Sequence, residues 1–405
     1  MWEQIRVNKR NSVLLLGAMA LALAALGFVL GMAFGGPDGG FIGLIVATAV
    51  WLVLMLISFA SGDKILLASS KAVPVTHDVH PQLFNVVEEM KIAANLPKMP
   101  DIYIINEAAP NAFATGRSPE SASVAVTAGL LAKLNRDELQ GVIAHEVSHI
   151  VNRDILFVTL AGVMLGSIVL LSQVFLRSMW YGGMGPSRRY SSRSSSNQGG
   201  AQIVFVIIAL VAAILAPIMA QLLYFALSRR REYLADAGAV RLTRYPEGLA
   251  SALEKIASDR TPLKAANKVT APMYISNPFR ALKAENLYST HPPIEERIRI
   301  LRAMSHGASF KDYSDAYSRT VGGSGVIPAR EARHAEPVEL RQPSAESKPQ
   351  EDRKRQIHDI GDIIRTVNRF AFLTCACGIK MKVPPGFKGD KVKCPRCGRI
   401  SSVHT

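Results

Sequence analysis

The chain has 405 residues, 49% of them hydrophobic and 20% charged, and its formal net charge is +15. The apolar residues are gathered into long blocks, which argues against an ordinary soluble protein as the whole molecule. The basic excess is compatible with nucleic acid or with anionic lipid. Clusters such as Ser228–Arg231 adjoin an apolar block, where basic residues routinely anchor a membrane span. The lipid bilayer is therefore the favoured partner, and nucleic acid the less favoured one.

Four blocks are long enough to cross the hydrocarbon of a bilayer, which takes about 20 residues. The first is longer than the apolar part of a signal peptide and is followed almost at once by the second, which predicts a retained anchor. The sequence thus predicts an α-helical membrane protein with four transmembrane helices in two hairpins, residues 1–60 and 155–227. The blocks lie near Ser12–Phe34, Phe41–Ala60, Ile155–Phe175 and Ile203–Leu227.

Basic residues indicate how the first hairpin is oriented. Arg6, Lys9 and Arg10 precede the first span, whereas the connection 35–40 has no lysine or arginine. This asymmetry places the N-terminus in the cytoplasm. The Arg/Ser-rich connection 177–202 disagrees, because its arginines would lie on the opposite side. The first hairpin is given more weight, since the first helix usually sets the topology. It predicts a multi-pass protein of the inner (plasma) membrane, with both termini and the domain between the hairpins cytoplasmic.

Residues 61–154 predict a small α+β domain. Apolar residues recur at helical spacing in 78–96, while 100–116 and 121–131 have the β-branched, partly alternating pattern of strands. Asn135 and Glu138 have the spacing of a capping box, which predicts the start of a further helix. That helix is predicted to continue without a break into the third apolar block.

This last helix carries His145, Glu146 and His149, the His-Glu-x-x-His pattern. On a helix the two imidazoles share one face and can bind Zn²⁺, and the glutamate is placed to take a proton from the attacking water. A third ligand is needed. No Gly-x-x-His follows, so a downstream helical glutamate of the gluzincin type is expected, and Glu232 is the candidate. Asp236, one turn later, is spaced to accept an N–H from a ligand histidine.

Simpler interpretations exist for both parts of this pattern. The two histidines could be satisfied by ordinary hydrogen bonds, and Glu232 could be an ion-pair partner of the adjacent arginines. Position favours the metal site, because the motif shortly precedes the third span and Glu232 closely follows the fourth. Two antiparallel spans would bring both to one membrane face. Arg153 and Asp154 separate the motif from the apolar run, which predicts a site about 15 Å outside the hydrocarbon, not within it.

Several blocks together resemble the signature blocks of the HtpX family of heat-shock membrane proteases, and the predicted spans resemble its layout. This family belongs to the same peptidase family as the type-one CAAX prenyl protease, and the similarity covers about Val7 to Ala303. It implies a membrane zinc endopeptidase that degrades misfolded or damaged membrane proteins. The blocks are Pro110–Gly116, Val124–Leu131, Asp137–Asp154, Ser228–Ala239 and Ser289–Ile298.

The resemblance also implies roles for single residues. His145, His149 and Glu232 match the zinc ligands, and Glu146 matches the general base. Asn111, Ala112 and Phe113 match the border of the strand that pairs with the substrate backbone. In related peptidases a histidine near the zinc stabilises the oxyanion, and His291 is the candidate here. The alternative is that His291 only precedes a helix that begins at the following prolines.

The C-terminal part departs from that family. Residues 228–320 predict the helical second part of the peptidase domain, and 321–360 have the composition of a disordered linker. Residues 361–405 contain all the cysteines of the chain, which argues against a disulfide framework and predicts a structural zinc ribbon in a reducing compartment. Free or redox-active cysteines are the alternative. The predicted ligands are Cys375, Cys377, Cys394 and Cys397.

The sequence therefore predicts a zinc endopeptidase with one catalytic and one structural Zn²⁺, acting on membrane proteins at the cytoplasmic face. Its ribbon would have a partner that the residues do not identify. Two other functions stay open at this point. One is a catalytically degenerate membrane scaffold that presents the ribbon, and the other is a CAAX-type processing protease.

Overall fold

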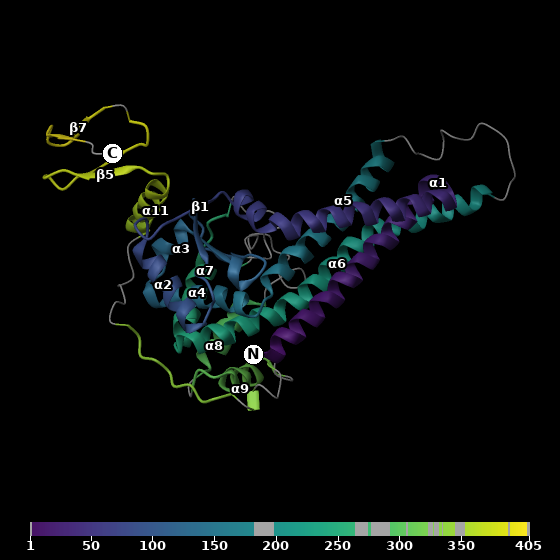
Figure 1. The fold of residues 1–405 in the computed structure, drawn as a ribbon, viewed down its shortest axis with the longest axis horizontal. Coiled ribbons are helices and arrows are strands. Elements are labelled where there is room, and N and C mark those ends of the chain that lie inside the picture. The colour runs from purple at the N-terminus through teal and green to yellow at the C-terminus, as the bar shows by residue number, and fades with distance from the viewer. Residues whose placement is uncertain are drawn as a thin grey trace.

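The computed structural model describes residues 2–181, 198–263, 274–276, 292–304, 307–322, 327, 332–333, 335–344, 353–387 and 389–402. A long helical arm leaves a mixed α/β domain on one side, and a small C-terminal module stands apart on the other (Figure 1). The arm consists of α1 (Trp2–Ser69), α5 (Ile155–Tyr181) and most of α6 (Gln198–Thr243). The predicted Arg/Ser-rich connection lies largely outside the described residues.

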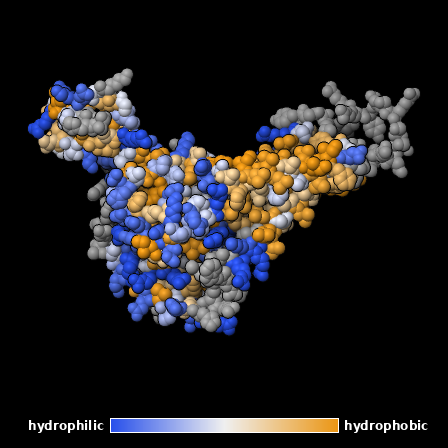
Figure 2. Space-filling view, viewed as in Figure 1, coloured by the Kyte–Doolittle hydropathy of each residue, from blue (hydrophilic) through white to orange (hydrophobic). Residues whose placement is uncertain are grey.

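The arm accounts for most of the exposed apolar surface. Within the described residues, three stretches are long and apolar enough to cross a membrane, Lys9–Gly35, Asp38–Ser69 and Ile155–Met179, in agreement with three of the predicted spans. The fourth is represented by a shorter apolar stretch, Val206–Leu222, so the fourth span remains a prediction. Hydrophobic residues cover the arm, whereas the domain is largely hydrophilic (Figure 2).

The element α1 turns back on itself and forms the first predicted hairpin. A Cβ atom placed on Gly31 would lie 2.1 Å from the carbonyl oxygen of Gly39. Only glycine lets the two helical backbones approach this closely. The glycines around the predicted connection are therefore what allows the two spans to pack side by side.

The domain is built on a four-stranded sheet with strands in the order β1-β2-β4-β3. The β2–β4 pair is parallel, and β3 runs antiparallel to β4 at the edge. One face of the sheet packs on α4 (Arg136–Val151) and α2 (Pro81–Ala93) in the main apolar core. These elements agree with the predicted helices and strands. The strands are β1 (Ala72–Pro74), β2 (Asp101–Ile105), β3 (Ala112–Thr115) and β4 (Ser123–Thr127).

Short helices complete the domain around this core. The 3₁₀ turn Pro119–Ser121 leads into β4, and α3 (Ala128–Lys133) follows it. Three more helices pack near α4 and α6: α7 (Pro246–Ser258), α8 (Ile294–Arg302) and α9 (Phe310–Thr320).

The prediction of one continuous helix from the histidine motif into the third span is wrong. α4 ends at Val151, and α5 begins at Ile155. Between them Arg153 has φ +56°, in the left-handed region, which ends the α-helix. The Asp154 carboxylate lies 3.1 Å from Nδ1 of His149. The break makes this contact possible, because it turns the Asp154 side chain, which follows α4, back toward His149.

A second predicted helix is also divided. The stretch from Ser228 was expected to continue through residue 259, but α6 ends at Thr243 and α7 starts at Pro246. Proline disfavours helical backbone at the residue before it, and Arg244 is left-handed with φ +56°. α7 can therefore fold back against α4.

The prediction of a disordered linker over 321–360 does not hold for residues 335–344, named here the docked linker. Its Arg341 donates to the carboxylate of Asp137 (2.9 Å), and the Ser344 N–H donates to the same carboxylate (2.8 Å). The Arg341 N–H also donates to the carbonyl of Arg244 (2.7 Å). Polar contacts hold this segment, so its lack of apolar residues did not indicate its order.

The C-terminal module begins with a helix that overlaps the predicted linker. α11 (Arg353–Val367) packs against α3, and its apolar side chains join the main core. Beyond it, β5 (Ala371–Thr374) pairs with β6 (Lys380–Val383), and β7 (Lys391–Lys393) pairs with β8 (Ile400–Ser402). Lys382 on β6 lies 2.5 Å from Asp362 on α11. Through α11 the two small sheets are attached to the α/β domain.

Candidate active site

The crossing of α4 and α6 sets the position of the site. A Cβ atom on Gly238 of α6 would lie 2.6 Å from Oγ of Ser148 on α4, so the absence of a side chain lets these helices meet. At its start, α4 has the predicted capping box between Asn135 and Glu138. Lys255 of α7 pairs with the Glu138 carboxylate at 2.7 Å. The helix that carries the histidine motif is thus fixed at its N-terminus and along its length.

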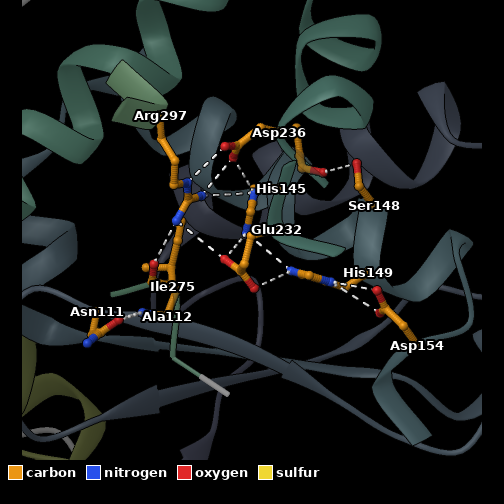
Figure 3. Close-up of polar contacts among 11 residues, drawn as sticks. Asn111, Ala112, His145, Ser148, His149, Asp154, Glu232, Asp236, Ile275 and Arg297 are labelled. Carbon is orange, nitrogen blue, oxygen red and sulfur yellow. Dashed lines mark hydrogen bonds and ion pairs between the residues drawn. The ribbon is translucent and has the colours of Figure 1, made fainter. Parts of the chain in front are cut away.

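At the crossing, His145, His149 and Glu232 turn their polar atoms toward one another (Figure 3). Nε2 of His145 lies 3.2 Å from Nε2 of His149. Each of these nitrogens lies 3.6 Å from an oxygen of Glu232. One ligand atom from each of the three residues lies within 4.8 Å of the ligand atoms of the other two. Two imidazoles and one carboxylate form a donor set that suits Zn²⁺.

Each histidine is oriented by a carboxylate at its other ring nitrogen. Oδ1 of Asp236 lies 2.9 Å from Nδ1 of His145, as the spacing in the sequence had suggested. Asp154 contacts Nδ1 of His149. Burial lowers the pKa of His149, but the charge of Asp154 outweighs it and raises that pKa to about 9. The same negative surroundings favour a metal cation at the opposite nitrogen.

A buried arginine that was not among the predicted site residues links these groups. Arg297 of α8 is 1% exposed, and its Nε and Nη2 donate to both oxygens of Asp236 at 2.8 and 2.7 Å. Its Nη1 lies 3.3 Å from Oε2 of Glu232. A signal was present, because Arg297 shares a helix face with the apolar Ile294 and Leu301. Asp154 was likewise predicted only to separate the histidine motif from the apolar run.

Glu146 lies beside this triangle with one oxygen uncommitted. The residue is 2% exposed, and its Oε1 has no hydrogen-bond partner among the described residues. Burial raises the pKa of Glu146, while the N–H of Ala114 on β3 donates to the carboxylate. A buried carboxylate with a free oxygen next to three metal-ligand atoms fits a site built for a bound ion and its water.

The residues expected at the substrate strand lie at the edge of the sheet. Ala112 and Phe113 belong to β3, and Asn111 immediately precedes it. The Asn111 carbonyl accepts from the Thr127 N–H of β4, so the next residue, Ala112, directs its carbonyl to the outer edge of the sheet. Tyr274–Ser276 of the same chain lies against this edge. His291 lies outside the described residues.

The cysteines form a separate cluster in the C-terminal module. Their sulfur atoms lie within 4.8 Å of one another, with Cys375 to Cys397 at 3.4 Å and Cys377 to Cys394 at 3.6 Å. Backbone N–H groups of Cys397 and Arg396 lower the pKa of Cys394. Four converging thiols in two sharp turns fit a closed structural zinc site.

Comparison with known proteins gives consistent relatives. The model described as peptidase family M48 matches residues 78–305. A protease HtpX homolog from Thermoanaerobacter pseudethanolicus is 47% identical over 306 residues, covering 75% of this chain and 98% of that protein. One from Dictyoglomus turgidum is 46% identical over 303 residues, covering 75% and 94%. The crystal structure of S. mikatae Ste24p is similar at 20% identity, covering 74% of this chain and 67% of that one. Its TM-score of 0.37 is too low to bear on the assignment.

Proposed function

The chain belongs to peptidase family M48 and is a membrane metalloprotease; from this premise we propose that it cleaves misfolded or damaged membrane proteins. The proposed place of cleavage is the cytoplasmic face of the inner membrane. One observation carries the proposal. His145, His149 and Glu232 converge on one point, and the buried Glu146 keeps an oxygen uncommitted beside it.

The proposed roles follow from these contacts. A zinc ion held by His145, His149 and Glu232 would supply the Lewis acid that polarises the scissile carbonyl and makes water more acidic. Glu146 accepts a proton from the attacking water at Oε1 and returns it to the leaving amine. Its pKa, raised by burial, brings its basicity closer to that needed near neutral pH.

The outer edge of β3 is proposed to hold the substrate. An extended peptide can add to an exposed sheet edge through main-chain hydrogen bonds, which tolerate many sequences. Ala112 offers a carbonyl at this edge, and the Asn111 amide lies next to it. Unfolded polypeptide of varied sequence is the substrate class that such an edge suits.

The membrane location of the substrates is supported by the position of the site. α6 carries Glu232 only ten residues after the apolar stretch that ends at Leu222, a rise of about 15 Å. The proposed cytoplasmic orientation rests on Arg6, Lys9 and Arg10 before the first span. Loops of membrane proteins that emerge at that surface would reach the site directly.

The proposal is tested with the full chain, purified in detergent with added zinc. We expect the wild type to hydrolyse casein, and Glu146→Gln to keep its zinc but lose activity by at least about 100-fold, because the general base is removed. Glu88→Gln, at an exposed position of α2, is the matched control and should cleave like the wild type. Casein cleavage by Glu146→Gln at the wild-type rate would exclude the assigned role.

A further inference from the structure

Tyr274–Ser276 occupies the edge of the sheet beside the candidate active site. β3 is an edge strand, and Ala112 directs its carbonyl away from β4. The Ile275 N–H donates to this carbonyl at 2.9 Å. All three residues of the segment are buried. A short piece of the chain itself therefore lies where an added strand would pair.

The main chain of this segment is held by side chains of the site. The Asn111 amide nitrogen donates to the carbonyl of Ser276 at 3.0 Å. Nη1 of Arg297 donates to the carbonyl of Ile275 at 3.1 Å, and the same nitrogen lies 3.3 Å from Glu232 (Figure 3). Only one guanidinium nitrogen thus separates the Ile275 carbonyl from a proposed zinc ligand.

The Tyr274 side chain anchors the segment on the face of the sheet opposite the main core. The ring of Tyr274 packs edge-on against that of Phe113, with centroids 5.2 Å apart. Its hydroxyl lies 3.4 Å from Oγ of Ser70. Tyr274 and Phe113 belong to a small apolar cluster that also includes Leu263.

These contacts are those expected for a bound extended peptide. Ala112, Asn111 and Arg297 recognise N–H and C=O groups, which every peptide has, and not a particular side chain. If the segment leaves, these buried groups lose their partners unless another main chain replaces it. Among the described residues, one main-chain hydrogen bond joins the segment to β3, fewer than a strand of a stable ladder makes.

We propose that Tyr274–Ser276 is an internal occupant of the peptide-binding edge, and that a substrate must displace it to pair with β3. This inference rests on the proposed function, because it regulates the same site. The apparent affinity for peptides is then reduced in proportion to the fraction of molecules in which the edge is free. Weakening the anchor of the segment raises that affinity.

The experiment separates binding from hydrolysis by using the Glu146→Gln background in the full zinc-loaded chain. The Kd of a fluorescein-labelled casein fragment is measured by anisotropy with and without Tyr274→Ala. We expect Tyr274→Ala to tighten binding about tenfold, since the free fraction rises. Leu263→Ala removes a side chain of the same apolar cluster that belongs neither to β3 nor to the segment, and should leave the Kd within about twofold.

Each result has one meaning. Tighter binding with Tyr274→Ala, together with faster casein cleavage when Glu146 is restored, supports the internal occupant. Tighter binding without cleavage by any form retains the occupant and rejects the proposed function. Unchanged or weaker binding with full zinc content shows that the segment is a permanent strand, which overturns the inference.

A second measurement covers the case in which Tyr274→Ala does not fold. A synthetic peptide with the sequence of residues 271–279 is added in excess to the wild type, and cleavage of casein is followed. The occupant predicts competitive inhibition, because the peptide reproduces the contacts of the internal segment. Absence of inhibition, with casein still cleaved, contradicts it.

Discussion

Both histidines of the site have their second ring nitrogen held by a carboxylate, and the two carboxylates come from different elements. Asp236 lies on α6, and Asp154 lies in the turn after α4. The two carboxylates therefore fix the orientation of both rings. Such partners stabilise the ring position and increase the basicity of the coordinating nitrogen.

We expect Asp154→Asn to lower zinc affinity by about 10–100-fold, because the amide removes the charge that supports His149. Competition with a chelator of known affinity measures this in the full chain. Asp78→Asn, whose side chain is 97% exposed, is the control and should bind zinc as the wild type does. An affinity within twofold of the wild type would show that Asp154 does not support the ligand.

At the scale of single residues, the sequence predicted contacts between residues one helical turn apart. It missed contacts between residues that only the folded chain brings together. Asp236 was predictable because it lies one helical turn after Glu232. Asp154 was not, since the left-handed backbone of Arg153 turns it back toward His149. Arg297 reaches Asp236 across 61 positions of the chain, a contact that no local spacing reveals.

Among the elements, the docked linker fixes the start of the helix that carries the histidine motif. Asp137 lies in the first turn of α4, where a negative charge is favourable. It accepts hydrogen bonds from Arg341 and Ser344 and is itself buried. The linker therefore links the C-terminal module to the N-terminus of α4.

We expect Arg341→Ala to weaken the docking by about 1–3 kcal/mol, because it leaves the buried Asp137 without its charged donor. Hydrogen exchange of residues 335–344 measures the loss of protection. Gln342→Ala, at an exposed position of the same segment, should leave protection unchanged. Full protection in Arg341→Ala would assign the docking to other contacts.

Acid should release the same segment. Burial raises the pKa of Asp137, but the hydrogen bonds from Ser344 and Arg341 outweigh it, and the pKa is lowered on folding. Stabilisation by a depressed carboxyl is present above its ordinary pKa of 3.8 and is lost as the pH falls through the lower folded value. Protection measured across this range should fall in the wild type, and Asp137→Asn should remove the dependence.

For the elements, periodicity predicted the strands, the capped helix and the apolar blocks, but not where the helices break. The two breaks depend on single left-handed residues, Arg153 and Arg244, and arginine gives no signal for that conformation. The order of the docked linker was missed because polar contacts, not apolar burial, hold it.

For the molecule as a whole, the C-terminal module is a small unit on a fixed support. α11 shares the core of the domain, while the described residues of the two small sheets form a minor apolar cluster that includes Cys375 and Cys394. So small a cluster contributes little folding free energy, and a metal held by the four cysteines would supply much of the remainder.

We therefore expect Cys394→Ser to lose one of two zinc ions per chain and to unfold only the two small sheets. Elemental analysis gives the zinc content, and hydrogen exchange should show lost protection in residues 371–402 but not in α4. Ser401→Ala, in the same module, is the matched control and should keep both ions. Unchanged zinc content in Cys394→Ser would show that the cysteines do not hold a metal.

The break at residues 152–154 has a mechanical consequence for the whole molecule. His145 and His149 stand on a helix that stops before α5, and the turn between the two helices carries Asp154, which contacts His149. Glu232 stands on α6, which runs unbroken from its apolar stretch to Thr243. Apolar helices tilt to match the thickness of the bilayer. α6 carries both the proposed ligand Glu232 and Asp236, which contacts Nδ1 of His145. A change in bilayer thickness that tilts α6 therefore acts on the site through these two carboxylates.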